Sequence, residues 1–212
     1  MKLKNKLEQH RNRFFEAVNN AEFTVNSSLI SPESWFFKVI EHLNEIKKSG
    51  KSLYFIGNGA SASIASHFAA DLTKNGLIPS YTLTDNALLT CFSNDYSYED
   101  AYMEILKKIM KNGDALIAIS SSGTSKNILK SAEFVKENFD NSQLITFTAF
   151  NPDNPLRKLG EYNLYLNTGE YSFAESGHAY YLHLLTDLFC NQETERMSNI
   201  VSILVNSVDE MK

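Results

Sequence analysis

Short strand-like runs alternate with helical patterns along most of the chain. Four apolar runs and one alternating run predict strands at 53–56, 80–84, 114–120, 143–147 and 162–166. Apolar residues at helical spacing predict helices at 3–24, 31–48, 61–74, 87–92, 98–110, 126–138, 155–159, 172–188 and 193–211. Because strands and helices alternate after residue 53, we expect an α/β fold with a doubly wound sheet of five parallel strands.

The helices at the two ends of the chain fall outside this alternation. The first two precede the first predicted strand and have no βαβ partner, so we expect them to pack on the domain or on another subunit. We predict one structural domain: residues 51–192 form its α/β body, 1–50 a helical extension, and 193–212 a C-terminal helix for packing or oligomer contacts.

Composition and charge exclude several classes of protein. The chain has 212 residues and a formal net charge of −5, which argues against a general nucleic-acid binder. The two cysteines form no CxxC motif, which favours a reducing, cytoplasmic compartment. The N-terminal residues are too polar for a signal peptide, and no apolar run approaches the length of a membrane span, so we expect no membrane association.

Two of the predicted strands run into loops of glycine and hydroxyl residues that open helices. The first loop is Gly57-Asn58-Gly59, followed by Ser61, and the second spans Ser120 to Ser125 with five hydroxyls in six residues. A helix N-terminus presents unpaired N–H groups at the positive end of the dipole, so each unit predicts an anion site. The first loop lacks the third glycine and the acidic residue of a dinucleotide fingerprint, and no P-loop sequence is present.

Candidate acid/base and metal-binding side chains lie on two of the helices. His67 and Asp71 are four residues apart and therefore share one helix face. This spacing suits a metal site or an acid/base pair, although a His and an Asp four residues apart are more often a plain hydrogen-bonded pair. Glu175, His178 and His183 lie on the long apolar helix, where histidines are usually core residues with satisfied hydrogen bonds.

Taken in order, these motifs resemble the SIS (sugar isomerase) domain family. The sequences that carry the resemblance are GNGASAS, SHFAADL, SNDYSYED, AISSSGTSKNI and the helix with Glu175 and His183. It covers roughly residues 35–190 and is most similar to the phosphoheptose isomerase branch. The resemblance implies conversion of sedoheptulose 7-phosphate to D-glycero-D-manno-heptose 7-phosphate for surface polysaccharide. It also implies a homotetramer with sites built between subunits.

The resemblance further implies roles for individual residues. It implies that the phosphate is held by Ser61, Ser120, Ser121, Ser122 and Ser125. It places Asn58 and Asp95 along the sugar, and zinc or another divalent metal on His67, Asp71, Glu175 and His183. Ketose–aldose isomerisation needs a base and a second proton-transfer group, for which we assign Asp71 and His183 as hypotheses.

The chain departs from this branch at two positions. The branch usually has Glu where this chain has Asp71, and Gln where it has Glu175. In addition, Glu175 and His183 are eight residues apart, a rise of about 12 Å along a straight helix. Both reach one ion only if the helix is irregular or starts late, or if neighbouring chains share the site.

Other functions stay open on the sequence. The chain is also compatible with an isomerase of another sugar phosphate. A non-catalytic SIS protein, either a scaffold such as the replication-initiation factor or a sugar-phosphate sensor, keeps the phosphate loops but needs no acid/base pair. A lyase or etherase of the same family is a third class. The ionisable residues His67, Asp71, Glu175 and His183 favour an isomerase.

Overall fold

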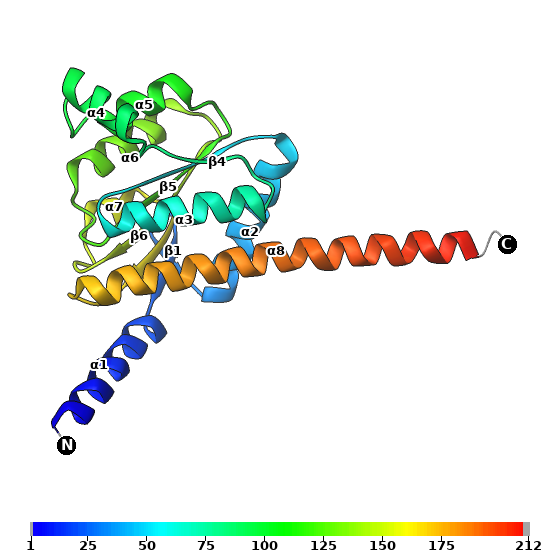
Figure 1. Cartoon of the computed structure of the whole chain (residues 1–212), viewed down its shortest axis with the longest axis horizontal. Helices are drawn as coiled ribbons and strands as arrows, with labels where there is room; N and C mark the ends of the chain where they lie inside the picture. Colours follow the sequence, from blue (N-terminus) through cyan, green and yellow to red (C-terminus); the bar gives the residue numbers. More distant parts are fainter. Residues whose placement is uncertain (1, 210–212) are drawn as a thin grey trace.

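The computed structural model describes residues 2–209, with side chains described as far as Asn191. Its centre is a seven-stranded sheet in the order β2-β1-β7-β6-β5-β3-β4 (Figure 1). The five predicted strands are present and all parallel: β3 (Leu53–Gly57), β4 (Ser80–Thr82), β5 (Ala115–Ser120), β6 (Gln143–Ala149) and β7 (Tyr162–Leu166). The predicted fold class is therefore confirmed.

Helices cover both faces of the sheet. One face carries α2 (Pro32–Ser49), α3 (Ala60–Lys74) and α8 (Tyr171–Asp209), and the last residues of α1 (Lys2–Asn19) pack against this layer. The other carries α4 (Asn86–Asp95), α5 (Ala101–Ile109), α6 (Lys126–Asn138) and α7 (Pro155–Leu159). Successive side chains of a strand point to opposite faces, so Phe55 belongs to the first core and its neighbours Tyr54 and Ile56 to the second.

A short β-hairpin was missed by the sequence analysis. β1 (Glu22–Val25) and β2 (Ser28–Ile30) pair with each other, and β1 adds antiparallel to β7 at the sheet edge. The two turn residues, Asn26 and Ser27, have φ of 48° and 64°, as a tight two-residue hairpin requires. The predicted helix at 3–24 was therefore too long, and the expectation that only helices precede the first parallel strand was wrong.

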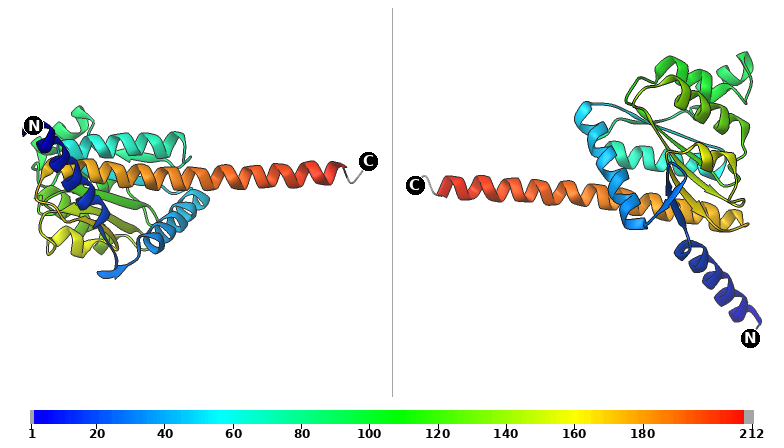
Figure 2. Two further views of the ribbon diagram at one scale, coloured as in Figure 1. Left: turned by 90° about the horizontal axis from the view of Figure 1, so that it is seen from below. Right: turned by 180° about the vertical axis from the view of Figure 1, so that it is seen from behind.

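Both ends of the chain project away from the α/β body (Figures 1 and 2). Only Ala17 and Val18 of α1 are buried, and its apolar residues Leu3, Leu7 and Phe15 are exposed. α8 is one continuous helix of 39 residues, so the backbone of the predicted segment 193–209 continues α8 rather than forming a separate helix. The side chains expected to make oligomer contacts there lie outside the described residues. Within the described chain, no helix combines the length and apolar character needed to cross a bilayer.

The segment between β4 and α5 also differs from expectation. Asp85 caps α4 by accepting a 3.0 Å hydrogen bond from the backbone N–H of Leu88. α4 then continues to Asp95, where the sequence predicted a loop at 93–96, and α5 begins at Ala101 rather than residue 98. A short loop, residues 96–100, connects the two helices.

Candidate active site

The loop between β3 and α3 is shaped by its two glycines. A Cβ on Gly57 would lie 2.6 Å from the backbone carbon of Ser61, so only glycine lets the strand and helix approach this closely. Gly59 has φ +56° and ψ −125°, a conformation that side chains strongly disfavour. On the adjoining helix α5, the buried Tyr102 hydroxyl donates a 2.8 Å hydrogen bond to the Gly57 carbonyl. These features fix Asn58 and Ser61 at the carboxyl end of β3.

The loop between β5 and α6 forms the second wall. Ser120 Oγ accepts from the N–H of Gly123 at 3.2 Å, and Ser122 Oγ accepts from the N–H of Thr124 at 3.3 Å. Ser125 is the N-cap residue of α6, but its hydroxyl makes no capping hydrogen bond with the backbone of the described helix. The Ser121 hydroxyl is buried without a hydrogen-bond partner among the described residues. A buried hydroxyl without a protein partner is available to hydrogen-bond a ligand.

The two loops meet in a cleft of about 160 Å³ at the carboxyl edge of the sheet. Its lining residues are Asn58, Ser61, Ile119, Ser120, Ser121, Ser122, Ser125, Tyr171 and Glu175. Every residue predicted to hold phosphate is in this set, together with Asn58. None of the described lining residues is a lysine or arginine, so an anion here is held by hydroxyls and helix N-termini.

A larger cavity of about 590 Å³ lies at the opposite edge, before β3 and β5 begin. It is lined in part by Lys51, Tyr54, Tyr81 and Asp114. The carboxylate of Asp114 is already bonded to the N–H groups of Ser52 and Lys111, at 2.9 and 2.8 Å. Ligands of parallel α/β sheets bind outside the carboxyl ends of the strands, so the smaller cleft is the better candidate site.

A second cluster joins α3 and α8, which lie side by side (Figure 1). Ligand atoms of His67, Asp71 and His183 all lie within 4.8 Å of one another. His67 Nε2 is 3.3 Å from Asp71 Oδ2, and the rings of His67 and His183 are 5.2 Å apart between centroids. Two imidazoles and a carboxylate are a donor set of catalytic zinc sites, which keep a further position open. These three residues therefore fit a divalent metal.

Two predicted site residues lie elsewhere. Glu175 lines the hydroxyl-lined cleft and is not in the His67–Asp71–His183 cluster, because α8 is regular and separates Glu175 from His183 by about 12 Å. Within one chain the structure thus brings together three of the four predicted metal ligands. Asp95 lies at the exposed end of α4, where Asn94 donates to it at 3.0 Å, and it does not line the cleft.

His178 is a core residue, as expected for a histidine on an apolar helix, but its buried Nδ1 has no hydrogen-bond partner among the described residues. Its Nε2 lies 3.1 Å from the carbonyl oxygen of Thr148, and the ring packs near Phe147. Complete burial lowers the pKa of His178 to about 4, so the ring is neutral at pH 7.

Three residues of the site were missed by the sequence analysis. Tyr171 lines the cleft four residues before Glu175, and this i,i+4 spacing on one helix was the signal available. Tyr98 and Asn127 both hydrogen-bond the side chain of Asn58. Neither bond has a local sequence signal, because the partners are 40 and 69 residues apart.

The fold and the hydroxyl-lined cleft define an α/β protein with an anion-binding type of cleft at the carboxyl ends of its parallel strands. The sequence profile of the SIS domain matches residues 33–141, just over half of the chain, which therefore belongs to the SIS domain family. This confirms the resemblance inferred from the motifs.

Individual relatives point to one branch of that family. A phosphoheptose isomerase of Campylobacter concisus is 36% identical over 141 residues, which are 64% of this chain and 68% of the relative. One from Helicobacter pylori strain P12 is 36% identical over 119 residues, 53% of this chain and 62% of the relative. The solved phosphoheptose isomerase of Francisella tularensis superposes with a TM-score of 0.76 at 20% identity, covering 91% of this chain and 100% of that one. This last likeness supports the fold.

Proposed function

We propose that the chain is an aldose–ketose isomerase that converts sedoheptulose 7-phosphate to D-glycero-D-manno-heptose 7-phosphate. The relatives described above are phosphoheptose isomerases, and the chain spans between about three fifths and two thirds of their length. The product would serve surface-polysaccharide synthesis. An isomerase of another sugar phosphate is the alternative that keeps the same site.

The observation that carries this proposal is the distance between the cleft and the His67–Asp71–His183 cluster. α3 carries Ser61 in the cleft and His67 six residues later, a rise of about 9 Å, and α8 carries Glu175 and His183 about 12 Å apart. Along both helices, the residues that line the cleft are therefore separated by about 9–12 Å from the His67–Asp71–His183 cluster. A long-chain ketose phosphate has its phosphate and its carbonyl at opposite ends, which suits this separation.

The chemistry then falls to Asp71 and His183. Asp71 takes a proton from C1 of the ketose while His183 gives a proton to the C2 oxygen, which yields an enediol. His183 then takes the proton of the C1 hydroxyl and Asp71 returns its proton to C2, so the aldose forms with no net gain or loss of atoms. Asp71 is half-buried and His183 is exposed, and both belong to one cluster, which suits their joint use.

We assign a bound zinc, or another divalent metal, to His67, Asp71 and His183. When bound, it would polarise the carbonyl and hydroxyl oxygens of the substrate. The resemblance-based assignment of Glu175 as a fourth ligand stays a prediction, as does contact of Asp95 with the sugar. Both would require groups brought together from neighbouring chains.

We further propose a cytoplasmic homotetramer, with residues 1–50 and 193–212 as extensions of a single domain. The exposed apolar residues Leu3, Leu7 and Phe15 of the projecting helix α1 support an oligomer contact. Sedimentation equilibrium tests this, because a monomer at micromolar concentration contradicts it.

The function is tested by incubating the purified protein with sedoheptulose 7-phosphate. The protein is assayed as isolated, after chelation, and after zinc is restored, and the product is identified by NMR. Metal-dependent formation of the heptose 7-phosphate is the expected result. No turnover by a folded, zinc-loaded protein contradicts the proposal and leaves another sugar phosphate or a binding role.

A further inference from the structure

The carboxamide of Asn58 is held in one orientation by Asn127. Asn127 is only 3% exposed, and its Oδ1 accepts a 3.0 Å hydrogen bond from the backbone N–H of Ile128. A backbone N–H can only donate, so this contact fixes which atom of Asn127 is oxygen. The two carboxamides then pair reciprocally: Asn58 Nδ2 donates to Asn127 Oδ1 at 2.9 Å, and Asn127 Nδ2 donates to Asn58 Oδ1 at 2.8 Å.

Tyr98 completes the bonding of the Asn58 oxygen. Its hydroxyl donates a 2.8 Å hydrogen bond to Asn58 Oδ1, which thereby accepts two bonds and has no lone pair left. A carboxamide has two acceptor and two donor positions, and three of the four are now used by protein. One N–H of Asn58 is left, on a residue that lines the phosphate cleft.

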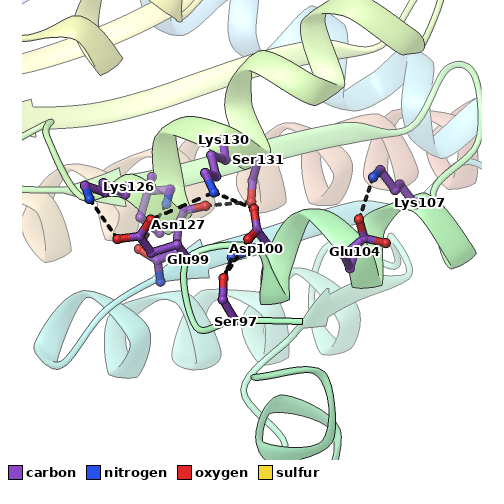
Figure 3. Close-up of polar contacts among 10 residues, drawn as sticks. Ser97, Glu99, Asp100, Glu104, Lys107, Lys126, Asn127, Lys130 and Ser131 are labelled. Atoms are coloured by element: carbon purple, nitrogen blue, oxygen red, sulfur yellow. Dashed lines mark hydrogen bonds and ion pairs between the residues drawn. The ribbon is translucent and has the colours of Figure 1, made fainter. Parts of the chain in front are cut away.

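The loop that carries Tyr98 is itself fastened to α6. Figure 3 shows Glu99 and Asp100 facing Lys126 and Lys130, with Ser97 bonded to Asp100 on the side away from the lysines. Ser97 Oγ donates to Asp100 Oδ2 at 2.6 Å, and Lys130 Nζ donates to Asp100 Oδ1 at 2.6 Å. The hydrogen bond between Lys130 and Asp100 lowers the pKa of Asp100 and raises that of Lys130, so both stay charged at neutral pH.

We propose that Tyr98 is a positioning residue for Asn58. Its hydroxyl, acting with Asn127, makes the Asn58 carboxamide a pure hydrogen-bond donor toward the substrate. The loop of residues 96–100, clamped to α6 by Asp100 and Lys130, holds the hydroxyl in place. This inference rests on the function proposed above for the cleft.

A double-mutant cycle tests the proposal in the full-length, zinc-loaded protein. Tyr98→Phe removes one neutral hydrogen bond and is expected to raise KM for sedoheptulose 7-phosphate about fivefold, with kcat changed less than about twofold. In an Asn58→Ala background the same change is expected to have no further effect, because Tyr98 acts through Asn58. Effects that multiply independently overturn the proposal.

Tyr96→Phe is the matched control. Tyr96 lies in the same loop and is 53% exposed, close to the 51% of Tyr98, and its ring stacks on Phe92. Removing its hydroxyl is expected to leave KM and kcat unchanged. An equal rise of KM in both variants would indicate general loosening of the loop and contradict a specific role for Tyr98.

A second readout separates this proposal from the proposed function. NMR measures hydrogen exchange of the Asn58 carboxamide without any substrate. Exchange is expected to be about fivefold faster in Tyr98→Phe than in the wild type, and unchanged in Tyr96→Phe. If the wild type turns over no sedoheptulose 7-phosphate but this difference in exchange is seen, the proposed isomerase function is wrong and the positioning role of Tyr98 is supported. Identical exchange in all three proteins overturns the positioning role.

Discussion

His67 Nε2 lies 3.3 Å from Asp71 Oδ2, one turn apart on α3, with His183 of α8 closing the cluster. The Asp71 side chain is 25% exposed and that of His67 54% exposed, so the carboxylate is the more enclosed of the two. A carboxylate grouped with two imidazoles can serve as a metal ligand or as a base. This pair is therefore where the proposed chemistry is most open to test.

Asp71→Asn is expected to reduce kcat by at least about 10²-fold, because the amide cannot take a proton. Circular dichroism should show an intact fold, since the side chain is only partly buried. Asp153→Asn is the control, because the Asp153 side chain is 82% exposed and pairs loosely with Lys158 at 3.5 Å. Asp153→Asn should keep wild-type turnover. Full activity of Asp71→Asn would remove Asp71 from the mechanism.

Ser121→Ala is expected to separate stability from binding. The Ser121 hydroxyl is buried without a partner among the described residues, so its removal should leave the free energy of unfolding unchanged or raise it by up to about 1 kcal/mol. The same change deletes a donor from the cleft and should weaken inhibition by inorganic phosphate about fivefold. Denaturant unfolding and phosphate competition measure the two effects.

Ser80→Ala gives the opposite pattern. The Ser80 hydroxyl is 3.0 Å from the Ile78 carbonyl oxygen, to which it donates, and lies away from the cleft. Its loss should cost about 1 kcal/mol of stability and leave phosphate inhibition as it was. If Ser121→Ala behaves like Ser80→Ala, the Ser121 hydroxyl is structural rather than part of the phosphate site.

Local signals explain why the cleft was predictable from sequence. Ser61 and Ser120–Ser125 directly follow predicted strands, and strand ends of a parallel sheet meet at one edge, so no long-range knowledge was needed. The hairpin was missed because β1 and β2 have only four and three residues and follow an amphipathic helix. Tyr98 was missed because its role depends on the packing of a loop against α6, which no sequence period reports.

Glu175→Gln is expected to strengthen phosphate binding. Glu175 lines the cleft beside the serines, so its negative charge opposes an anion there. Neutralising it should lower the inhibition constant of inorganic phosphate about fivefold, a modest electrostatic gain at a partly exposed site. Tyr171→Phe is the control, since it changes a neighbouring cleft residue without changing charge, and it should shift phosphate inhibition much less.

Zinc affinity of Glu175→Gln decides between the two assignments of this residue. The geometry within one chain predicts unchanged affinity, because Glu175 is outside the His67–Asp71–His183 cluster. A marked change in zinc affinity, measured by competition with a chelator, would instead support the fourth-ligand role implied by the sequence.

The buried His178 is expected to make stability depend on pH. Its pKa is lowered from 6.5 to about 4, so between these values the unfolded chain binds a proton that the folded chain does not. The free energy of unfolding therefore rises as the pH increases from about 4 to 6.5 and falls as the pH decreases through this range. Above pH 6.5, this contribution to stability is complete. This pKa shift corresponds to a change of about 3 kcal/mol in the free energy of unfolding, at about 1.36 kcal/mol per pKa unit.

Denaturant unfolding at several pH values measures this dependence. His178→Asn should unfold more easily at pH 7 but lose much less further stability between pH 6.5 and 4 than the wild type does, because it has no imidazole to titrate. Leu185→Ala is the control: this residue is also buried on α8, and its truncation should lower stability by about 2–5 kcal/mol while keeping the wild-type pH slope. Equal slopes in all three proteins would mean that His178 does not titrate in this range on unfolding.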